Sequence, residues 1–190
     1  MRGWTLVEIL ITVTISAIAG SVLVAMLVSS NTVFFSQSAE VVHGLSLNNS
    51  ISNINDVIKE SVGIASQYPP SGQAQYVTGT NSLVLKLAAY DAASSLIDNI
   101  FDYAIIHRDI SQDQILRKKI IPDAISLRRA ENLVLSTNLK DISFYYFDIN
   151  GNSVTPVRAA RVNFTIILSQ IQGNSQKESS ASSDVNLKNI

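Results

Sequence analysis

One stretch near the start of the chain restricts its fold more than any other feature. No Asp, Glu, Lys or Arg occurs between Glu8 and Glu40, and the segment from Ile9 to Val28 is almost wholly apolar. About 20 such residues in a helix span roughly 30 Å, the thickness of the hydrocarbon core of a bilayer. Charged residues make up only 15% of the chain, whereas about 25% is typical of a soluble domain. The sequence therefore predicts a membrane-inserted N-terminal helix.

The residues around this run indicate its orientation and leave three interpretations open. Arg2 is the only basic residue before the run, which favours an N-terminus in the cytoplasm. A cleaved secretory signal fits the small residues Ala17 and Ala19, but the apolar run continues past them. An uncut signal anchor explains the length of the run and gives Glu8 no role. The third interpretation depends on the residues that precede the run.

The six residues Gly3-Trp4-Thr5-Leu6-Val7-Glu8 come directly before the apolar run. They resemble the processing signal of type IV pilins and type II secretion pseudopilins, in which a short basic leader ending in Gly is followed by an aromatic residue, Thr-Leu-Val-Glu and an apolar helix. The resemblance implies that a prepilin peptidase cuts between Gly3 and Trp4. It also implies N-methylation of Trp4 and a role for Glu8 in placing the subunit in a filament.

Two residues differ from what is usual in that family, and the chemistry of Glu8 supports its special role. Trp4 stands where the family usually has Phe, and the leader Met1–Gly3 is very short. A carboxylate beside hydrocarbon costs about 2.5–3.5 kcal/mol at mid-depth when it has no partner. After cleavage, the α-amino group of Trp4 on a neighbouring subunit is a candidate partner for Glu8. Because desolvation opposes the Coulomb attraction of such a pair, we expect it mainly to fix axial register.

The helix is predicted to continue beyond the membrane. No Pro occurs before Pro69. Apolar residues recur at spacings of three and four from Asn48 onward, which is typical of one face of a helix; they are Ile51, Ile54, Ile58, Val62 and Ala65. We therefore expect a helix from Trp4 to about Ala65, first apolar all round and then amphipathic, with its apolar stripe covered by a sheet.

Alternating apolar and polar residues predict strands in the second half of the chain. The two prolines of Tyr68–Gly72 break the helix, and residues 73–80 are expected to form a loop. Period-two patterns follow at 83–88, 103–108, 142–147 and 162–168. Strands in this order predict an antiparallel sheet. The predicted fold class is therefore α+β, a long pilin-like N-terminal helix packed on a C-terminal antiparallel β-sheet.

Three further segments of this half give weaker signals. The basic run at 115–120 is predicted to be exposed or at a sheet edge. The Ser-rich segment 173–183 is predicted to be a loop or a solvated strand, and residues 184–190 to close the sheet. Short motifs in this half resemble, in their order, those of minor pilin-like subunits of the PilW or GspJ type: Asp102-Tyr103, Leu116-Arg117, Asn138-Leu139, Arg161-Val162 and Leu187-Lys188-Asn189.

These features together predict four segments: a leader at 1–3, a transmembrane or filament-core part of the helix at 4–30, an amphipathic part at 31–67 and a β-domain at 68–190. The resemblance implies a minor subunit held in the cytoplasmic membrane by one span and later assembled into an extracytoplasmic or extracellular filament. Its expected partners are the prepilin peptidase, other pilin or pseudopilin subunits, the inner-membrane assembly platform and, before assembly, membrane lipid. A type II secretion pseudopilin and an extracytoplasmic binding domain with an uncut anchor are the alternatives.

No catalytic or cofactor motif stands out in the sequence. It has no Cys, no Gly-rich phosphate loop, no serine-nucleophile elbow and no zinc-binding His pair. We therefore predict a non-enzymatic protein without a cofactor or metal, in which His43 and His107 are structural or solvated. Residues 148–152 resemble the first half of a calcium loop, but no acidic residue follows up to Asn163, so a hairpin turn is expected.

Nucleic acid is not an expected partner. The net charge is −1, whereas phosphate contacts require a basic surface. The only basic clusters are residues 117–119 and 128–129, and Asp113, Asp123 and Glu131 lie close to them in the sequence.

Overall fold

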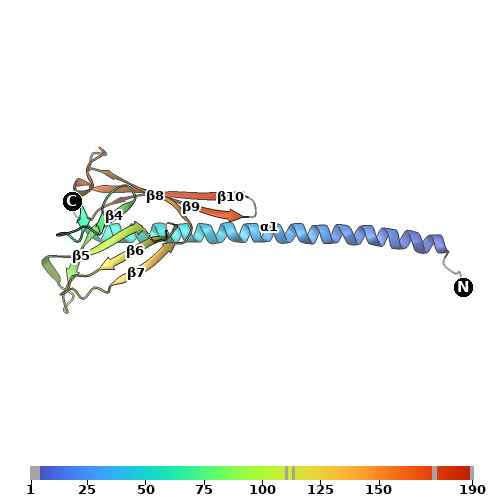
Figure 1. Cartoon of the computed structure of the whole chain (residues 1–190), viewed down its shortest axis with the longest axis horizontal. Coiled ribbons are helices and arrows are strands. Elements are labelled where there is room, and N and C mark those ends of the chain that lie inside the picture. Colours follow the sequence, from blue (N-terminus) through green and yellow to red (C-terminus); the bar gives the residue numbers. More distant parts are fainter. Residues whose placement is uncertain (1–4, 110, 113, 173–174, 189–190) are drawn as a thin grey trace. The chain divides into compact units, whose positions relative to one another are not determined.

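The computed structural model describes residues 5–109, 111–112, 114–172 and 175–188. The chain divides into two compact units, residues 1–42 and 43–190, which are described separately. Helix α1 (Leu6–Glu60) is followed, in the described residues, by strands and one short 3-10 turn (Pro156–Arg158). The strands, labelled in part in Figure 1, are β1 (Ser61–Ile64), β2 (Gln67–Tyr68), β3 (Tyr76–Val77), β4 (Ser82–Tyr90), β5 (Leu96–Arg108), β6 (Leu116–Ile121), β7 (Glu131–Ser136), β8 (Leu139–Phe147), β9 (Arg161–Gln172) and β10 (Ser175–Asn186).

The α+β fold class predicted from the sequence is confirmed, but the strands form three sheets where one was expected. Their orders are β1-β4-β5-β6-β7, β10-β9-β8 and β2-β3, and neighbouring strands are antiparallel. Strand β8 pairs with β9 and not with the preceding β7. The chain therefore starts a second sheet at Leu139, which gives the helix two sheet faces to pack against.

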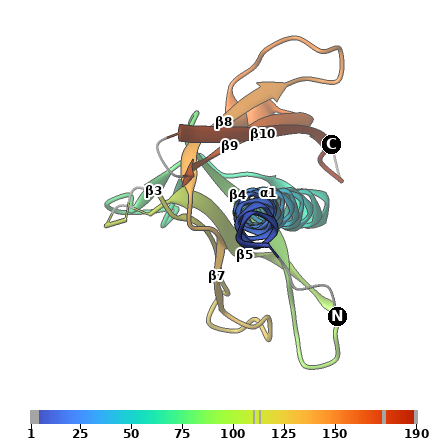
Figure 2. The ribbon, with the colours of Figure 1, turned by 90° about the vertical axis from the view of Figure 1, so that its right-hand side faces the viewer.

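The core of the C-terminal unit lies where α1 meets these two larger sheets. In Figure 2 this part of α1 runs between β8-β9-β10 on one side and β4-β5 on the other. Leu47, Ile54, Val57 and Ile58 form the buried stripe of the helix, at the spacing of three and four that places side chains on one helical face. The predicted positions Ile54 and Ile58 are confirmed as buried, and Ile51 is partly buried.

The helix ends at Glu60, earlier than predicted. The hydroxyl of Ser61 donates to the carbonyl of Ile58 at 2.6 Å, and the chain then pairs with β4, with Ile64 opposite Leu85. Val62 lies in β1. Ala65 comes directly after this strand and donates its N–H to the carbonyl of Val84. The prediction that Val62 and Ala65 belong to the helix is therefore wrong. Pairing with β4 supplies the backbone hydrogen bonds that a longer helix would have made.

The prediction of an exposed or edge strand at 115–120 is also wrong. Strand β6 lies between β5 and β7, and Leu116 is fully buried. Strand β7, which covers the outer edge of β6, was not predicted from the sequence. Neither were β1, β2 and β3, of which β3 lies in the predicted loop 73–80. In the Ser-rich segment the prediction of a strand is confirmed from Ser175 to Ser183, and the strand is exposed from Gln176 to Ser180. Gly173 and Asn174 lie outside the described residues, as do Asn189 and Ile190 of the predicted closing segment.

Candidate membrane-insertion and assembly surface

The part of α1 in the N-terminal unit carries an apolar surface along its whole described length. The exposed fraction of its large hydrophobic side chains ranges from 48% at Val22 to 80% at Leu6. The surface continues through Phe34 and Phe35 to Val42, so burial of the helix begins later than the predicted amphipathic boundary at residue 31. Within the described residues, α1 is the one helix long and apolar enough to cross a bilayer.

Four hydroxyl groups on this surface are turned back onto the helix. Thr12 donates to the carbonyl of Glu8 at 2.7 Å, Thr14 to that of Leu10 at 2.8 Å, Ser21 to that of Ile18 at 2.8 Å, and Thr32 to that of Val28 at 2.9 Å. A hydroxyl without a partner is costly in hydrocarbon, and a bond to the preceding turn removes most of that cost. These polar residues are therefore compatible with lipid or with a dry subunit interface.

Apolar side chains supply the driving force for leaving water. Leu, Ile and Val each contribute about −0.3 to −0.6 kcal/mol when placed centrally in a bilayer-spanning helix. The eleven exposed Leu, Ile and Val side chains between Ile9 and Val28 thus give about 3–7 kcal/mol in favour of insertion. One unpaired charge costs about 2.5–3.5 kcal/mol on the same scale, so the absence of charge from this segment is a physical requirement.

Glu8 closes the N-terminal end of the helix together with Thr5. The Glu8 carboxylate Oε2 accepts hydrogen bonds from the Thr5 backbone N–H at 2.9 Å and from the Thr5 hydroxyl at 3.0 Å. The Glu8 backbone N–H in turn approaches the Thr5 hydroxyl oxygen at 3.3 Å. This reciprocal arrangement is a capping box, which satisfies donors that the first helical turn leaves without intrahelical partners. Glu8 therefore has a structural role that the sequence analysis did not assign to it.

The capping box could have been found in the sequence, because Thr5-x-x-Glu8 before an apolar run is its signature. Both of its residues lie after the predicted cleavage site, so removal of a leader ending at Gly3 leaves the capping box in the chain. Gly3 and Trp4 themselves lie outside the described residues. Among the described residues, the side-chain hydrogen bonds of Glu8 use Oε2 and not Oε1.

In the C-terminal unit, a buried ion network engages Arg128, one residue of the basic cluster 128–129. Asp102 is fully buried and accepts hydrogen bonds at 2.8 Å from the Asp123 N–H, the Ser126 hydroxyl and Arg128 Nε. Arg128 also reaches Glu60 at the end of α1 at 2.6 Å and the carbonyl of Ala88 in β4 at 3.0 Å. This network joins the end of the helix to the β-sheet, so Arg128 has a structural role.

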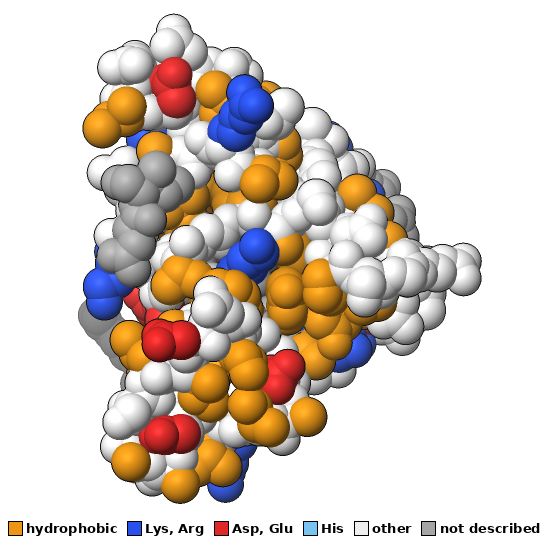
Figure 3. All heavy atoms as spheres, turned by 90° about the vertical axis from the view of Figure 1, so that its left-hand side faces the viewer, with side chains coloured by type: hydrophobic (Ala, Val, Ile, Leu, Met, Phe, Trp, Pro, Cys, Tyr) orange, Lys and Arg blue, Asp and Glu red, His pale blue; other side chains and the backbone are white. Residues whose placement is uncertain are grey.

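The second basic cluster is divided between the two faces of the five-stranded sheet. Lys118 is largely buried and pairs with Glu131 at 3.0 Å. Arg117 pairs with Asp109 at 2.5 Å on the opposite face. In the view of Figure 3, Lys and Arg side chains stand apart among hydrophobic and uncharged ones. Because an extended basic surface is what binds a phosphate backbone, the face shown gives no support to a nucleic-acid interface.

The candidate calcium loop is a turn, as predicted. The Asp148 carboxylate accepts hydrogen bonds from the backbone N–H groups of Asn150 and Asn152 at 2.8 Å and from the Asn152 side chain at 3.0 Å. These bonds, that from the Asn152 side chain foremost, hold the pKa of Asp148 below its usual value. Gly151 adopts φ of 85°, which glycine accommodates without strain. Among the described residues, no group of three His, Asp or Glu side chains is placed to hold a metal ion.

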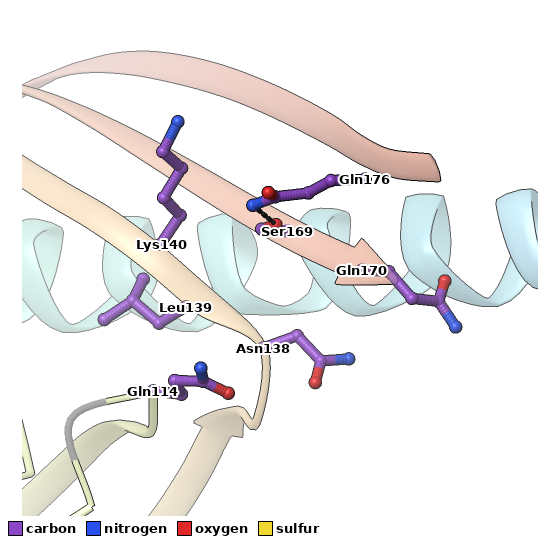
Figure 4. A pocket seen from close by; sticks show the side chains of 7 residues that line it. All are labelled: Gln114, Asn138, Leu139, Lys140, Ser169, Gln170 and Gln176. Atoms are coloured by element: carbon purple, nitrogen blue, oxygen red, sulfur yellow. Dashed lines mark hydrogen bonds between the residues drawn. The ribbon is translucent and has the colours of Figure 1, made fainter. Parts of the chain in front are cut away.

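A cavity of about 470 Å³ lies beside the β8–β9 pair and is lined mainly by amide side chains. Gln176 donates to the Ser169 hydroxyl at 2.7 Å, and Lys140 pairs with Glu178 at 2.6 Å. Figure 4 shows that Lys140 points away from Asn138 and Gln170. Since the polar groups do not converge on one point, the described lining of the cavity has no arrangement that would fix a ligand.

The chain matches no protein-family model, and no curated protein matches it. What the fold itself defines is an α+β protein whose described part has one helix capable of crossing a membrane. Any finer class depends on the N-terminal motif and on the surface and capping box described above.

Proposed function

We propose that this protein is a minor type IV pilin-like subunit, which a prepilin peptidase processes after Gly3 and which assembles through α1 into a pilus or pseudopilus. The observation that carries the proposal is the surface of residues 6–42, where large apolar side chains are about half or more exposed and no charge occurs between Glu8 and Glu40. Such a surface must be covered by lipid or by other apolar helices. Assembly would exchange the first environment for the second, so no enzymatic activity is required of the chain.

The expected sequence of events follows from that exchange. Before assembly the helix lies in the cytoplasmic membrane, with its N-terminus on the cytoplasmic side and residues 43–190 outside. In the filament, the Glu8 carboxylate meets the α-amino group of Trp4 from a neighbouring subunit, while the capping box keeps the carboxylate at the start of the helix. The type II secretion pseudopilin alternative uses the same steps. An uncut membrane anchor would share the insertion step and lack the processing and the assembly.

Two substitutions separate the capping role of Glu8 from its proposed role in assembly. Glu8→Gln keeps an acceptor for the capping box, since Gln serves there as Glu does, and removes the charge. Thr5→Val keeps the charge and removes the capping hydroxyl, which costs about 0.5–2 kcal/mol of helix stability. We expect Glu8→Gln to reduce incorporation into sheared filaments at least about tenfold, equivalent to about 1.4 kcal/mol, and Thr5→Val to leave incorporation within about twofold of the natural chain.

The measurement is the ratio of chain in the filament fraction to chain in the membrane fraction, determined by quantitative immunoblotting. Both variants should remain membrane-inserted, because neither changes the apolar run. If Glu8→Gln assembles as well as the natural chain does, the charge of Glu8 has no part in assembly. The carboxylate then acts only through the helix cap.

A further inference from the structure

A second polar site lies on the outer face of the five-stranded sheet, away from α1. Opposed residues in an antiparallel pair lie on the same face, and so do residues two apart along one strand. His107 in β5 pairs with Arg117 in β6, and Lys119 in β6 pairs with Asn132 in β7. These four side chains therefore share one face, and they line a cavity of about 460 Å³ with Tyr76, Asp109 and Ser111.

The hairpin β2-β3 builds the wall of this cavity. It covers part of the outer face by packing Tyr68 and Tyr76 against a small cluster of Ala65, Val84 and Ile105. The centres of the Tyr76 and His107 rings are 4.8 Å apart, and Lys119 Nζ lies 5.8 Å from the Tyr76 ring centre. His107 is 8% exposed, so its ring is held by packing on a rigid sheet. Sites with preorganised side chains lose little entropy when a ligand binds.

The charged groups in this cavity that remain available are hydrogen-bond donors. Asp109 is engaged by the Ser111 N–H at 2.9 Å, the Ser111 hydroxyl at 2.7 Å and Arg117 Nε at 2.5 Å. The bonds from the Ser111 side chain and from Arg117 hold the pKa of Asp109 well below its usual range, so it stays ionised and occupied. Among the described residues, Arg117 hydrogen-bonds through Nε, which leaves both Nη groups free to donate.

Lys119 completes the set of donors, and the His107 ring lies in the same cavity. Among the described residues, the interaction of Lys119 is with the Tyr76 ring and no carboxylate pairs with it. His107 Nδ1 lies 2.8 Å from the Arg108 carbonyl, which only accepts, so Nδ1 carries the proton and Nε2 is the other polar atom of the ring. Among the described lining residues, two cations against one carboxylate leave one net positive charge.

We propose that this cavity binds a single oxyanion, the phosphate or carboxylate group of a small ligand, through Arg117 and Lys119. An oxyanion supplies the acceptors that the free donors require, and the guanidinium fork matches its geometry. One net charge is too little for a nucleic-acid backbone, whose binding requires several phosphate contacts. The site is independent of the assembly surface, so the failure of either proposal leaves the other standing.

The test uses the full chain in an uncharged maltoside detergent, with NMR signals of the two histidine rings as the readout. Inorganic phosphate and glucuronate are titrated separately at constant ionic strength, with glucose as the neutral control. We expect a saturable shift of the His107 ring signals with at least one oxyanion at concentrations on the order of 10 mM, which nearly saturates a site with Kd of about 1 mM. Glucose should leave the His107 signals unchanged.

Matched charge substitutions then locate the site. Arg117→Gln and Lys119→Gln should each weaken binding about tenfold, whereas Arg158→Gln, the same change at an exposed position outside the cavity, should leave it unchanged. Lys119→Gln keeps the Arg117–Asp109 pair, so its effect does not depend on that pair. Phosphate binding alone points to a phosphate ester and glucuronate binding alone to an acidic sugar. The absence of a saturable His107 shift with both anions, or equal weakening by Arg158→Gln, would overturn the proposal.

Discussion

Replacing Arg128 with Met is expected to destabilise the C-terminal unit by about 3–5 kcal/mol, because it leaves a buried carboxylate without its counter-ion. Asp102 is fully buried and Arg128 is its only basic partner among the described residues. For a unit of this size, each kcal/mol lowers Tm by about 2–4 °C, so a decrease of roughly 6–20 °C is expected. The measurement is thermal unfolding of the full chain in detergent, followed by the circular dichroism of its strands.

Two further variants assign this loss to the buried charge. Arg129→Met makes the same change at the neighbouring exposed residue and should shift the free energy of unfolding by no more than about 0.5 kcal/mol. Asp102→Asn combined with Arg128→Met should recover part of the stability, because the unpaired charge is then absent. A Tm for Arg128→Met equal to that of Arg129→Met would show that the network contributes no stability.

Two lysines in the apolar helix are expected to abolish membrane insertion. Ile15→Lys and Val22→Lys together cost about 5–7 kcal/mol, as much as or more than the 3–7 kcal/mol that favour insertion of the natural segment. The double variant should therefore no longer be found in the carbonate-resistant membrane pellet, whereas each single variant should be lost from it only in part. Because both positions are more than 45% exposed, the substitutions bury no new charge in the folded chain.

The matched control for this experiment lies in the C-terminal unit. Ile149→Lys and Val157→Lys make the same chemical change at side chains that are 86% and 57% exposed, and the pair should leave the membrane fraction unchanged. If the variant that carries both Ile15→Lys and Val22→Lys stays in the pellet, insertion through residues 9–28 is contradicted. The same result would remove the basis for assembly through this surface.

Local patterns predicted those parts of the fold that depend on local physics. The uncharged run predicted α1, and alternation predicted strands β4, β5, β8 and β9, because side-chain period and burial coincide there. The boundary at Glu60 and the strand β7 depend on pairing with β4 and β6, and neither pairing leaves a local signal. The same holds for the Asp102–Arg128 pair, whose members are 26 residues apart. Leu116 lies in the core and Lys118 reaches Asn53 of α1, so their burial depends on tertiary packing that the basic run does not indicate.

The apolar surface of α1 and its Glu8 were more predictable from the sequence than the polar networks of the C-terminal unit. Glu8 was singled out because a carboxylate beside an apolar run is costly, and its capping partner Thr5 was available in the sequence through the Thr-x-x-Glu spacing. The cavity of His107, Arg117 and Lys119 could not be predicted, since it requires the strand register and the cover given by the β2-β3 hairpin. In the sequence Arg117 and Lys119 form one basic run with Lys118, whose side chain faces the other side of the sheet.

Mass spectrometry of the mature N-terminus, on the chain purified from its native membranes and filaments, tests the central proposal most directly. A processed pilin-like subunit will begin at Trp4, carry one methyl group on its α-amino nitrogen and retain the Thr5–Glu8 capping box. A chain that begins at Gly20 would indicate a cleaved secretory signal. A chain that still begins at Met1 would indicate an uncut anchor, and either result would contradict processing and assembly as a pilin-like subunit.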